Sequence, residues 1–271
     1  MILAIDIGNT HTVVGIFDKH KLLGDWRVTS FITRTEDEFG MLVQQFCEDA
    51  RVPLKKITSI GISSVVPNLT DVCVQMSRKY FMIEPIVISA QLNLGIKVSY
   101  DDPNAVGADR LCNAVAAYSK YKGPVVVVDF GTATTYDVIS KEGEYLGGAI
   151  TAGIETSAGE LHRRAAKLPK VDLKFPEKVI GKTTVESMQA GILYGALDAM
   201  ETMIRRISKE LDDYPTVVAT GGYSAVMNKQ SKVINKHEPT LVLDGIRKIV
   251  ERVESRSKGK SVQERPKKRR R

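Results

Sequence analysis

The sequence carries one short pattern twice: an apolar run leads into Asp-x-Gly, and a second apolar run follows a few residues later. The copies span 4–17 and 125–139, and an offset of 123 residues aligns Asp6 with Asp129, Gly8 with Gly131, and Thr12 with Thr135. Each copy predicts a strand, a tight polar turn and a second strand. Two short hairpins can match by chance, but the repeat favours two similar domains that face each other, each with one phosphate-facing loop.

The tip of the first hairpin is suited to phosphate. Gly8 allows the backbone to come close to a ligand, and Asn9, Thr10 and Thr12 carry donors for phosphate oxygens. Asp6, at the end of the strand, suits a hydrated cation better than phosphate because like charges repel. One hairpin of this type is equally typical of a simple turn, so the interpretation depends on the second copy.

Length and composition indicate a globular protein. A chain of 271 residues suits one large or two medium domains, and 43% hydrophobic residues are enough for a sizeable core. No apolar run is long enough to cross a membrane, and the strand-like segment after Met1 predicts no signal peptide. The widely spaced Cys47, Cys73 and Cys112 indicate reduced thiols in the cytoplasm rather than disulfides or a metal site.

The basic residues are concentrated at the C-terminus. The formal charge is +7, but residues 256–271 contain nine Lys or Arg and one Glu, so residues 1–255 carry −1. A near-neutral body makes nucleic acid an unlikely partner, since binding would require basic residues clustered on a folded face. The tail 256–271 has almost no apolar residues and is expected to be disordered. A solvated appendage is its simplest explanation, and weak contact with nucleic acid is the alternative.

Local patterns predict an α/β chain of two domains, with boundaries at 1–117 and 118–255 and the tail at 256–271. The first half has the expected order β-β-β-α-β-α-β, which is typical of an α/β domain. Beyond the hairpins, the expected strands are 22–28, 57–65, 86–88, 144–150 and 216–220, and the expected helices are one opening at Thr35 and then 69–80, 109–120, 156–166, 184–211 and 246–253.

Asp109 and Arg110 fall at the start of the expected helix 109–120. An acid directly beside a base is unusual there for simple packing. An acidic first turn with a surface arginine is the ordinary alternative.

Two further stretches are open to a functional or a plain structural explanation. The pair Gly221-Gly222 could lie flat against a nucleobase, although a plain turn is more common after a strand. Small residues such as Gly191 and Gly195 in the expected helix 184–211 permit close approach of another helix, from this chain or from a second copy.

Other common site patterns are not found in the sequence. Gly181-Lys182-Thr183 resembles the end of a Walker A loop, but Pro176 stands where the first glycine belongs. Neither a Rossmann-type Gly-x-Gly-x-x-Gly nor a Gly-x-Ser-x-Gly elbow occurs, which disfavours a dinucleotide site and a serine hydrolase. The four histidines have no metal-ligand spacing.

Together, the paired hairpins and the Gly-Gly turn resemble the actin, Hsp70 and sugar-kinase superfamily of ATP-binding proteins. The resemblance is closer still to type III pantothenate kinases and covers about residues 1–250. Five segments carry it: Asp6–Thr10, Gly107–Arg110, Asp129–Thr135, Gly147–Ile150 and Thr220–Gly222. The fold that it implies is two duplicated ribonuclease-H-like α/β domains with a cleft between them.

The resemblance implies a homodimeric kinase that phosphorylates pantothenate to 4'-phosphopantothenate, the first step of coenzyme A biosynthesis, with ATP, Mg²⁺ and K⁺ or NH₄⁺. It assigns ATP binding to Asp6, Ile7, Gly8, Asn9, Thr10, His11, Thr12, Val13 and Thr132. It assigns the monovalent cation to Asp129. It assigns pantothenate to Tyr100, Gly107, Ala108, Asp109 and Arg110, with Thr184 reaching across the dimer interface. Asp109 corresponds to the general base.

These roles are chemically coherent. A primary alcohol is a poor nucleophile, so a carboxylate such as Asp109 must accept its proton. Arg110 has the shape to bind the substrate carboxylate, and it is expected to keep Asp109 ionised at neutral pH. One alternative is an ATP-binding regulatory protein of the same fold that contacts nucleic acid through its tail, because the family also has a name taken from a proposed role in gene activation. A kinase for another hydroxylated acid is a third hypothesis.

Overall fold

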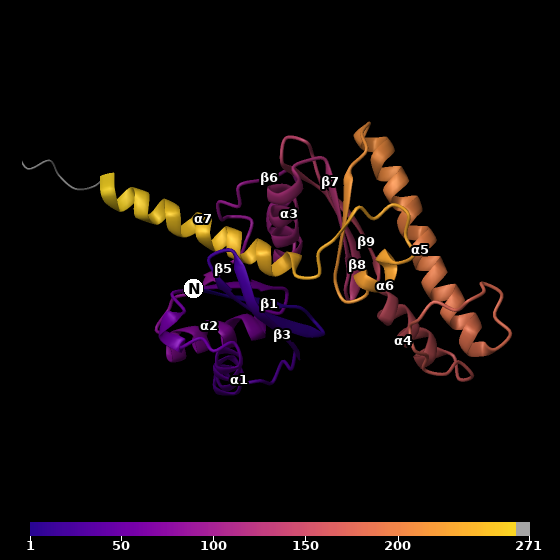
Figure 1. Cartoon of the computed structure of the whole chain (residues 1–271), viewed down its shortest axis with the longest axis horizontal. Helices are drawn as coiled ribbons and strands as arrows, with labels where there is room; N and C mark the ends of the chain where they lie inside the picture. Colours follow the sequence, from indigo (N-terminus) through magenta and orange to yellow (C-terminus); the bar gives the residue numbers. More distant parts are fainter. Residues whose placement is uncertain (264–271) are drawn as a thin grey trace, which may run out of the picture. The chain divides into compact units, whose positions relative to one another are not determined.

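The computed structural model describes residues 1–263 and divides the chain into two compact units, each with its own sheet (Figure 1). Unit 1 comprises Met1–Lys97, Asp101–Ala116 and, among the described residues, the segment 242–263, and unit 2 comprises Val98–Tyr100 and Ala117–Leu241. No helix within residues 1–263 is long and apolar enough to cross a membrane.

Unit 1 is built on a five-stranded sheet of order β3-β2-β1-β4-β5. Its strands are β1 (Ile2–Ile7), β2 (His11–Asp18), β3 (Lys21–Thr29), β4 (Ser59–Ser64) and β5 (Ile86–Val87), and its helices are α1 (Glu36–Asp49), α2 (Pro67–Phe81), the start of α3 (Ala108–Tyr121) and α7 (Leu241–Gln263). β1 and β2 are antiparallel, whereas β4 and β5 run parallel to β1. The core on one face joins Leu3 and Ile5 of β1 to Val43 of α1 and Met76 of α2.

Unit 2 repeats this arrangement with one additional strand, in the order β11-β10-β7-β8-β9-β6. Its strands are β6 (Lys97–Val98), β7 (Val125–Phe130), β8 (Ala133–Ile139), β9 (Glu144–Ala152), β10 (Thr216–Thr220) and β11 (Lys236–His237), and its helices are α4 (Ile154–Arg164), α5 (Thr184–Leu211) and α6 (Ser224–Asn228). The antiparallel strands β7, β8 and β9 correspond to β1, β2 and β3 of unit 1. The strands β10 and β11, which continue the sheet in parallel beyond β7, correspond to β4 and β5. Leu193, Leu197 and Met200 of α5 pack against Val126 and Val128 of β7.

The two hairpins differ by one residue at the tip, which corrects the predicted alignment. Ile7 pairs with Thr12 in the first hairpin, whereas Phe130 pairs with Thr134 in the second. Thr12 is therefore equivalent to Thr134 and not to Thr135, and both equivalent residues are buried. Because side chains alternate along a strand, the shift of one residue places Thr135 on the opposite face of its sheet from Thr134.

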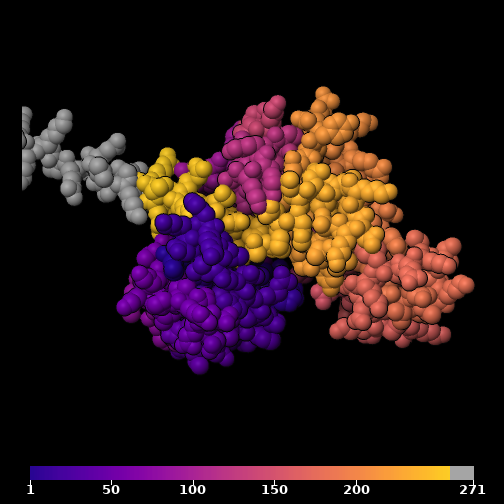
Figure 2. Space-filling model, in the orientation of Figure 1, coloured from indigo at the N-terminus to yellow at the C-terminus, as the bar shows by residue number. Residues whose placement is uncertain are grey.

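Helix α7 corrects the predicted domain division, which assigned residues 118–255 to the second domain. A Cβ on Gly61 of β4 would lie 2.6 Å from side-chain atoms of Ile246 and Val250, so α7 packs directly on the sheet of unit 1. Figure 2 shows the helix, in yellow, against the indigo N-terminal segment. An apolar helical stripe predicts that one face is buried, but it does not say against which sheet.

The same helix is longer than predicted. The expected helix 246–253 lies inside α7, which continues to Gln263 and so takes in the first residues of the predicted disordered tail 256–271. The rest of that tail, 264–271, lies outside the described residues. Elsewhere the local patterns agree well with the structure: α5 has the predicted bounds Thr184–Leu211, and Thr35 caps α1 in a capping box with Glu38.

Candidate active site

The first hairpin tip, residues 8–11, joins β1 to β2. The Gly8 N–H donates to the His11 carbonyl at 3.0 Å, and a Cβ on Gly8 would lie only 3.0 Å from the same oxygen. Asn9 and Thr10 are exposed at the tip, as a ligand-binding loop requires. Ile7 and Thr12 are buried, so their side chains belong to the support of the loop. β1 is buried along almost its whole length, with only Asp6 half-buried, so its pattern does not separate ligand-facing positions from supporting ones.

Asp6 lies at the end of β1, beside the parallel strand β4. Its carboxylate accepts a hydrogen bond of 2.7 Å from Ser63, which is completely buried. The two residues are directly opposite each other in the β1–β4 register. Ser63 thus orients Asp6, a role that the sequence analysis missed because it depends on strand pairing.

Asp109 and Arg110 form the first turn of α3. The Asp109 carboxylate accepts the Arg110 backbone N–H at 2.8 Å. Burial raises the pKa of Asp109, and this effect exceeds the opposite one of the Arg110 N–H and guanidinium. Arg110 favours the ionised form of Asp109, as expected from the sequence, but desolvation is the larger effect and the net shift of the pKa is upward. Arg110 is only 9% exposed, so the surface-arginine alternative is wrong.

Asp6 and Asp109, the two candidate site carboxylates of unit 1, lie near the buried thiol of Cys112. Burial, followed by the negative charges of Asp6 and Asp109, raises the pKa of Cys112 well above its usual value. The end of β1 and the start of α3 therefore present Asp6 and Asp109 to one region of unit 1. A Cβ on Gly107 would lie 2.5 Å from Asp109 Oδ1, so a larger residue at this position would press on the carboxylate.

In unit 2, Asp129 stands at the end of β7, next to β10, where it pairs with Thr220. Gly221 follows with a φ of +89°, and a Cβ on it would lie 2.4 Å from Asp129 Oδ1. The turn between β10 and α6 therefore passes directly over the carboxylate. Thr132, at the tip of the second hairpin, is exposed.

Ser224 and His237, which the sequence patterns did not identify, support the Gly221 turn through hydrogen bonds. Ser224 Oγ donates to the Gly221 carbonyl at 2.6 Å and lies 3.0 Å from His237 Nε2. Because the single hydroxyl proton goes to Gly221, the imidazole Nε2 is the donor to Ser224. No local pattern marks this pair, since His237 comes from β11.

The remaining predicted substrate residues belong to unit 2. Tyr100 is 39% exposed, and its ring approaches Tyr145 with centroids 6.3 Å apart. Thr184 is the first residue of α5 and is exposed. Gly107 to Arg110 belong to unit 1, so the predicted pantothenate residues come from both units.

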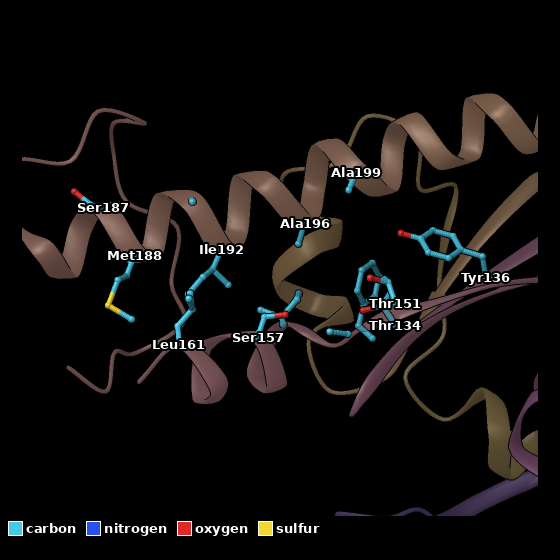
Figure 3. Close-up of a pocket in the computed structure, with 14 residues that line it drawn as sticks. Thr134, Tyr136, Thr151, Ser157, Leu161, Ser187, Met188, Ile192, Ala196 and Ala199 are labelled. Atoms are coloured by element: carbon cyan, nitrogen blue, oxygen red, sulfur yellow. The ribbon is translucent and has the colours of Figure 1, made fainter. Parts of the chain in front are cut away.

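A groove of about 400 Å³ runs along α5 in unit 2 (Figure 3). Met188, Ile192 and Ala196 of α5 line one side, and Ser157 and Leu161 of α4 line the other. Nothing lies within 4 Å of a Cβ built on Gly191 or Gly195 of α5. The helix therefore has an open, small-residue face next to the groove.

The order of both sheets defines the class of protein: two ribonuclease-H-like domains of the actin, Hsp70 and sugar-kinase type. Similar solved structures include an inorganic polyphosphate/ATP-glucomannokinase from Arthrobacter, with a TM-score of 0.50 and 16% identity over 93% of this chain and 98% of that one. A Campylobacter jejuni protein assigned to the Baf family of transcriptional activators has a TM-score of 0.60 and 19% identity over 93% and 99%. At these identities the likeness shows the fold.

Sequence comparison shows the family. A profile of the type III pantothenate kinases matches residues 2–206. The type III pantothenate kinase of Geobacter sulfurreducens is 44% identical over 93% of this chain and 99% of its own length. That of Moorella thermoacetica is 45% identical over the same shares. The chain belongs to the type III pantothenate kinase family.

Proposed function

We propose that this protein is a kinase that transfers the γ-phosphoryl group of ATP to the primary hydroxyl of pantothenate, the first step of coenzyme A biosynthesis. The observation that carries the proposal is the environment of Asp109. It is a desolvated carboxylate of raised pKa, fixed by the Arg110 N–H, in the same unit as the first phosphate hairpin. A general base works best when its pKa lies close to the working pH. The family membership supports the same activity.

Each predicted residue then has a chemical task. Asp109 accepts the hydroxyl proton as transfer proceeds, while the Arg110 guanidinium pairs with the pantothenate carboxylate. Gly107 and Ala108 bring the backbone of the α3 start close to the substrate, with Tyr100 and Thr184 as further contacts. The first hairpin, residues 6–13, holds the ATP phosphates, with side-chain donors from the exposed Asn9 and Thr10 and from Thr132 in the second hairpin. Phosphoryl transfer depends mainly on such positioning and on neutralising charge.

Two cations complete the proposal. Asp6, oriented by Ser63, carries a carboxylate that would hold a hydrated Mg²⁺, and the ion would neutralise charge on the ATP phosphates. Asp129 is assigned to a monovalent cation, K⁺ or NH₄⁺, and the close passage of the Gly221 turn over its carboxylate supports a defined site there. The buried free thiols of Cys47, Cys73 and Cys112 support a cytoplasmic location.

A coupled assay of ADP release tests the function directly. With ATP and Mg²⁺, we expect ADP production that depends on pantothenate and is at least about tenfold faster in K⁺ than in Na⁺ at equal ionic strength, because the two ions differ in preferred coordination. A panel of other hydroxylated acids is the control for substrate class. Pantothenate-independent ADP release, or none in either salt, contradicts the kinase proposal, whereas equal rates in both salts contradict only the cation.

We also propose a homodimer that uses the open face of α5. Ile150 is 63% exposed and Leu161 is 43% exposed, and Leu161 borders the groove beside Gly191. A second copy would cover these apolar side chains, and burying apolar surface is the main favourable term in association.

Gly195→Glu tests this interface. A charged side chain on the small-residue face is expected to convert a dimer into a monomer, measured by size-exclusion chromatography with light scattering. Lys141→Glu, in the exposed β8–β9 turn, is the matched control and should remain dimeric. A wild-type monomer, or a dimer that withstands Gly195→Glu, contradicts the proposal.

A further inference from the structure

Both hairpin tips are held by hydrogen bonds from the residue that follows the third strand of their sheet. In unit 1, the Ser30 N–H donates to the Thr10 carbonyl at 3.0 Å. In unit 2, the Gly153 N–H donates to the Thr132 carbonyl, also at 3.0 Å. The strand registers make Ser30 equivalent to Gly153 and Thr10 equivalent to Thr132. The same backbone contact therefore occurs in both halves of the duplicated fold.

A hydroxyl group adds a second hydrogen bond at each tip, but from a different position. Ser30 Oγ donates to the Gly8 carbonyl at 2.7 Å and lies 2.9 Å from Thr12 Oγ1. Since the one Ser30 hydroxyl proton goes to Gly8, Thr12 donates to Ser30. In unit 2, Thr156 Oγ1 donates to the Thr132 carbonyl at 2.6 Å.

The different lengths of the two tips explain why the hydroxyl comes from a different position in each unit. The second tip is one residue shorter, and a Cβ on Gly153 would lie 2.2 Å from the Gly131 carbonyl and 2.5 Å from that of Thr132. No side chain fits at this position, so the hydroxyl comes from Thr156 in the first turn of α4. The longer first tip leaves room for Ser30 itself.

We propose that Ser30 and Thr156 are positioning residues that orient the two hairpin tips for the phosphates of ATP. A trans peptide points its C=O and its N–H in opposite directions. Anchoring the carbonyls of Gly8, Thr10 and Thr132 therefore sets the direction of the N–H groups of Asn9, His11 and Ala133. Preorganised N–H groups bind phosphate without losing free energy to loop ordering. This inference rests on the proposed function, which has ATP at these tips.

Ser30→Ala and Thr156→Val test the inference, because each removes a hydroxyl while leaving the backbone hydrogen bond. We expect kcat/KM for ATP to fall about 3- to 10-fold in each, the effect of the one or two neutral hydrogen bonds that the hydroxyl makes. With ATP saturating, kcat/KM for pantothenate should change less than about twofold. Thr156→Ser, which keeps the hydroxyl, should restore the ATP value. Ser140→Ala removes a hydroxyl at the opposite end of the second hairpin and should leave both values unchanged.

Calorimetric titration with ATP in the absence of pantothenate separates this inference from the activity on which it rests. Weaker ATP binding by Ser30→Ala and Thr156→Val, with wild-type binding by Ser140→Ala, supports the positioning role even if pantothenate is not phosphorylated. Wild-type ATP affinity in both variants overturns it. Equal losses of kcat/KM for both substrates, with a lowered melting temperature, also overturn it, because they indicate general structural damage.

Discussion

Asp109→Asn is expected to lower kcat about 10²–10⁴-fold while leaving the KM for ATP nearly unchanged. The amide keeps the size of the side chain and its acceptor for the Arg110 N–H, but it cannot accept the proton of the pantothenate hydroxyl. Steady-state kinetics with both substrates measure the change. Asp101→Asn, at an exposed position in the preceding loop, is the control and should retain activity. Near-normal turnover in Asp109→Asn would reject this residue as the base.

The same variant has an expected effect on stability. Burial raises the pKa of Asp109 in the folded state, so the folded protein binds this proton more tightly than the unfolded chain. The ionised carboxylate therefore lowers the free energy of unfolding at neutral pH, and this loss disappears as the pH falls through the raised pKa. Asp109→Asn removes the charge, so its melting temperature at pH 7 should equal or exceed that of the wild type. A clear decrease would show that lost turnover reflects misfolding.

The pH dependence supplies a third readout for Asp109. The base must be ionised to accept a proton, so kcat/KM for pantothenate should fall as the pH drops through its pKa. Because burial raises the pKa of Asp109, this acid limb should lie above the ordinary aspartate value of about 3.9. The limb should be absent from the residual activity of Asp109→Asn.

Gly221→Ala is expected to lower kcat/KM for ATP by about 10²-fold. Gly221 has a φ of +89°, and a Cβ there would lie 2.4 Å from Asp129 Oδ1 and 2.7 Å from backbone atoms of Phe130. Strain and overpacking of this kind cost about 3 kcal/mol. If this cost is borne by the ATP-binding site, kcat/KM for ATP falls about 10²-fold. The turn must move away from Asp129, so the rate advantage of K⁺ over Na⁺ should shrink in the same variant.

Gly159→Ala is the matched control for this substitution. No atom lies within 4 Å of a Cβ at Gly159 in α4, and alanine favours a helix over glycine. Its kinetics should remain within about twofold of the wild type. Wild-type ATP kinetics in Gly221→Ala would show that the Gly221 turn has no part in the site.

Local sequence patterns predicted most of the fold because they report interactions within a few residues. The Thr35–Glu38 capping box begins α1, and the apolar periodicity of 184–211 predicts α5 with its observed bounds. The repeated Asp-x-Gly pattern predicts the duplicated sheets, whose strand orders agree. For the site, the motifs identified Asp6, Asp109 and Asp129 as candidate carboxylates, since residue type and position at an element end are visible in the sequence.

Tertiary structure alone decided the features that depend on distant partners. The place of α7 on the sheet of unit 1 follows from its packing on Gly61, and no pattern within the helix specifies that partner. The strand register makes Thr134 the equivalent of Thr12, because the second tip is one residue shorter than the first and every later position is shifted by one. The direction of the Asp109 pKa shift is set by desolvation, which depends on the whole fold around α3. Sequence thus determined which groups are present at the element ends, and long-range packing determined their neighbours and their charge.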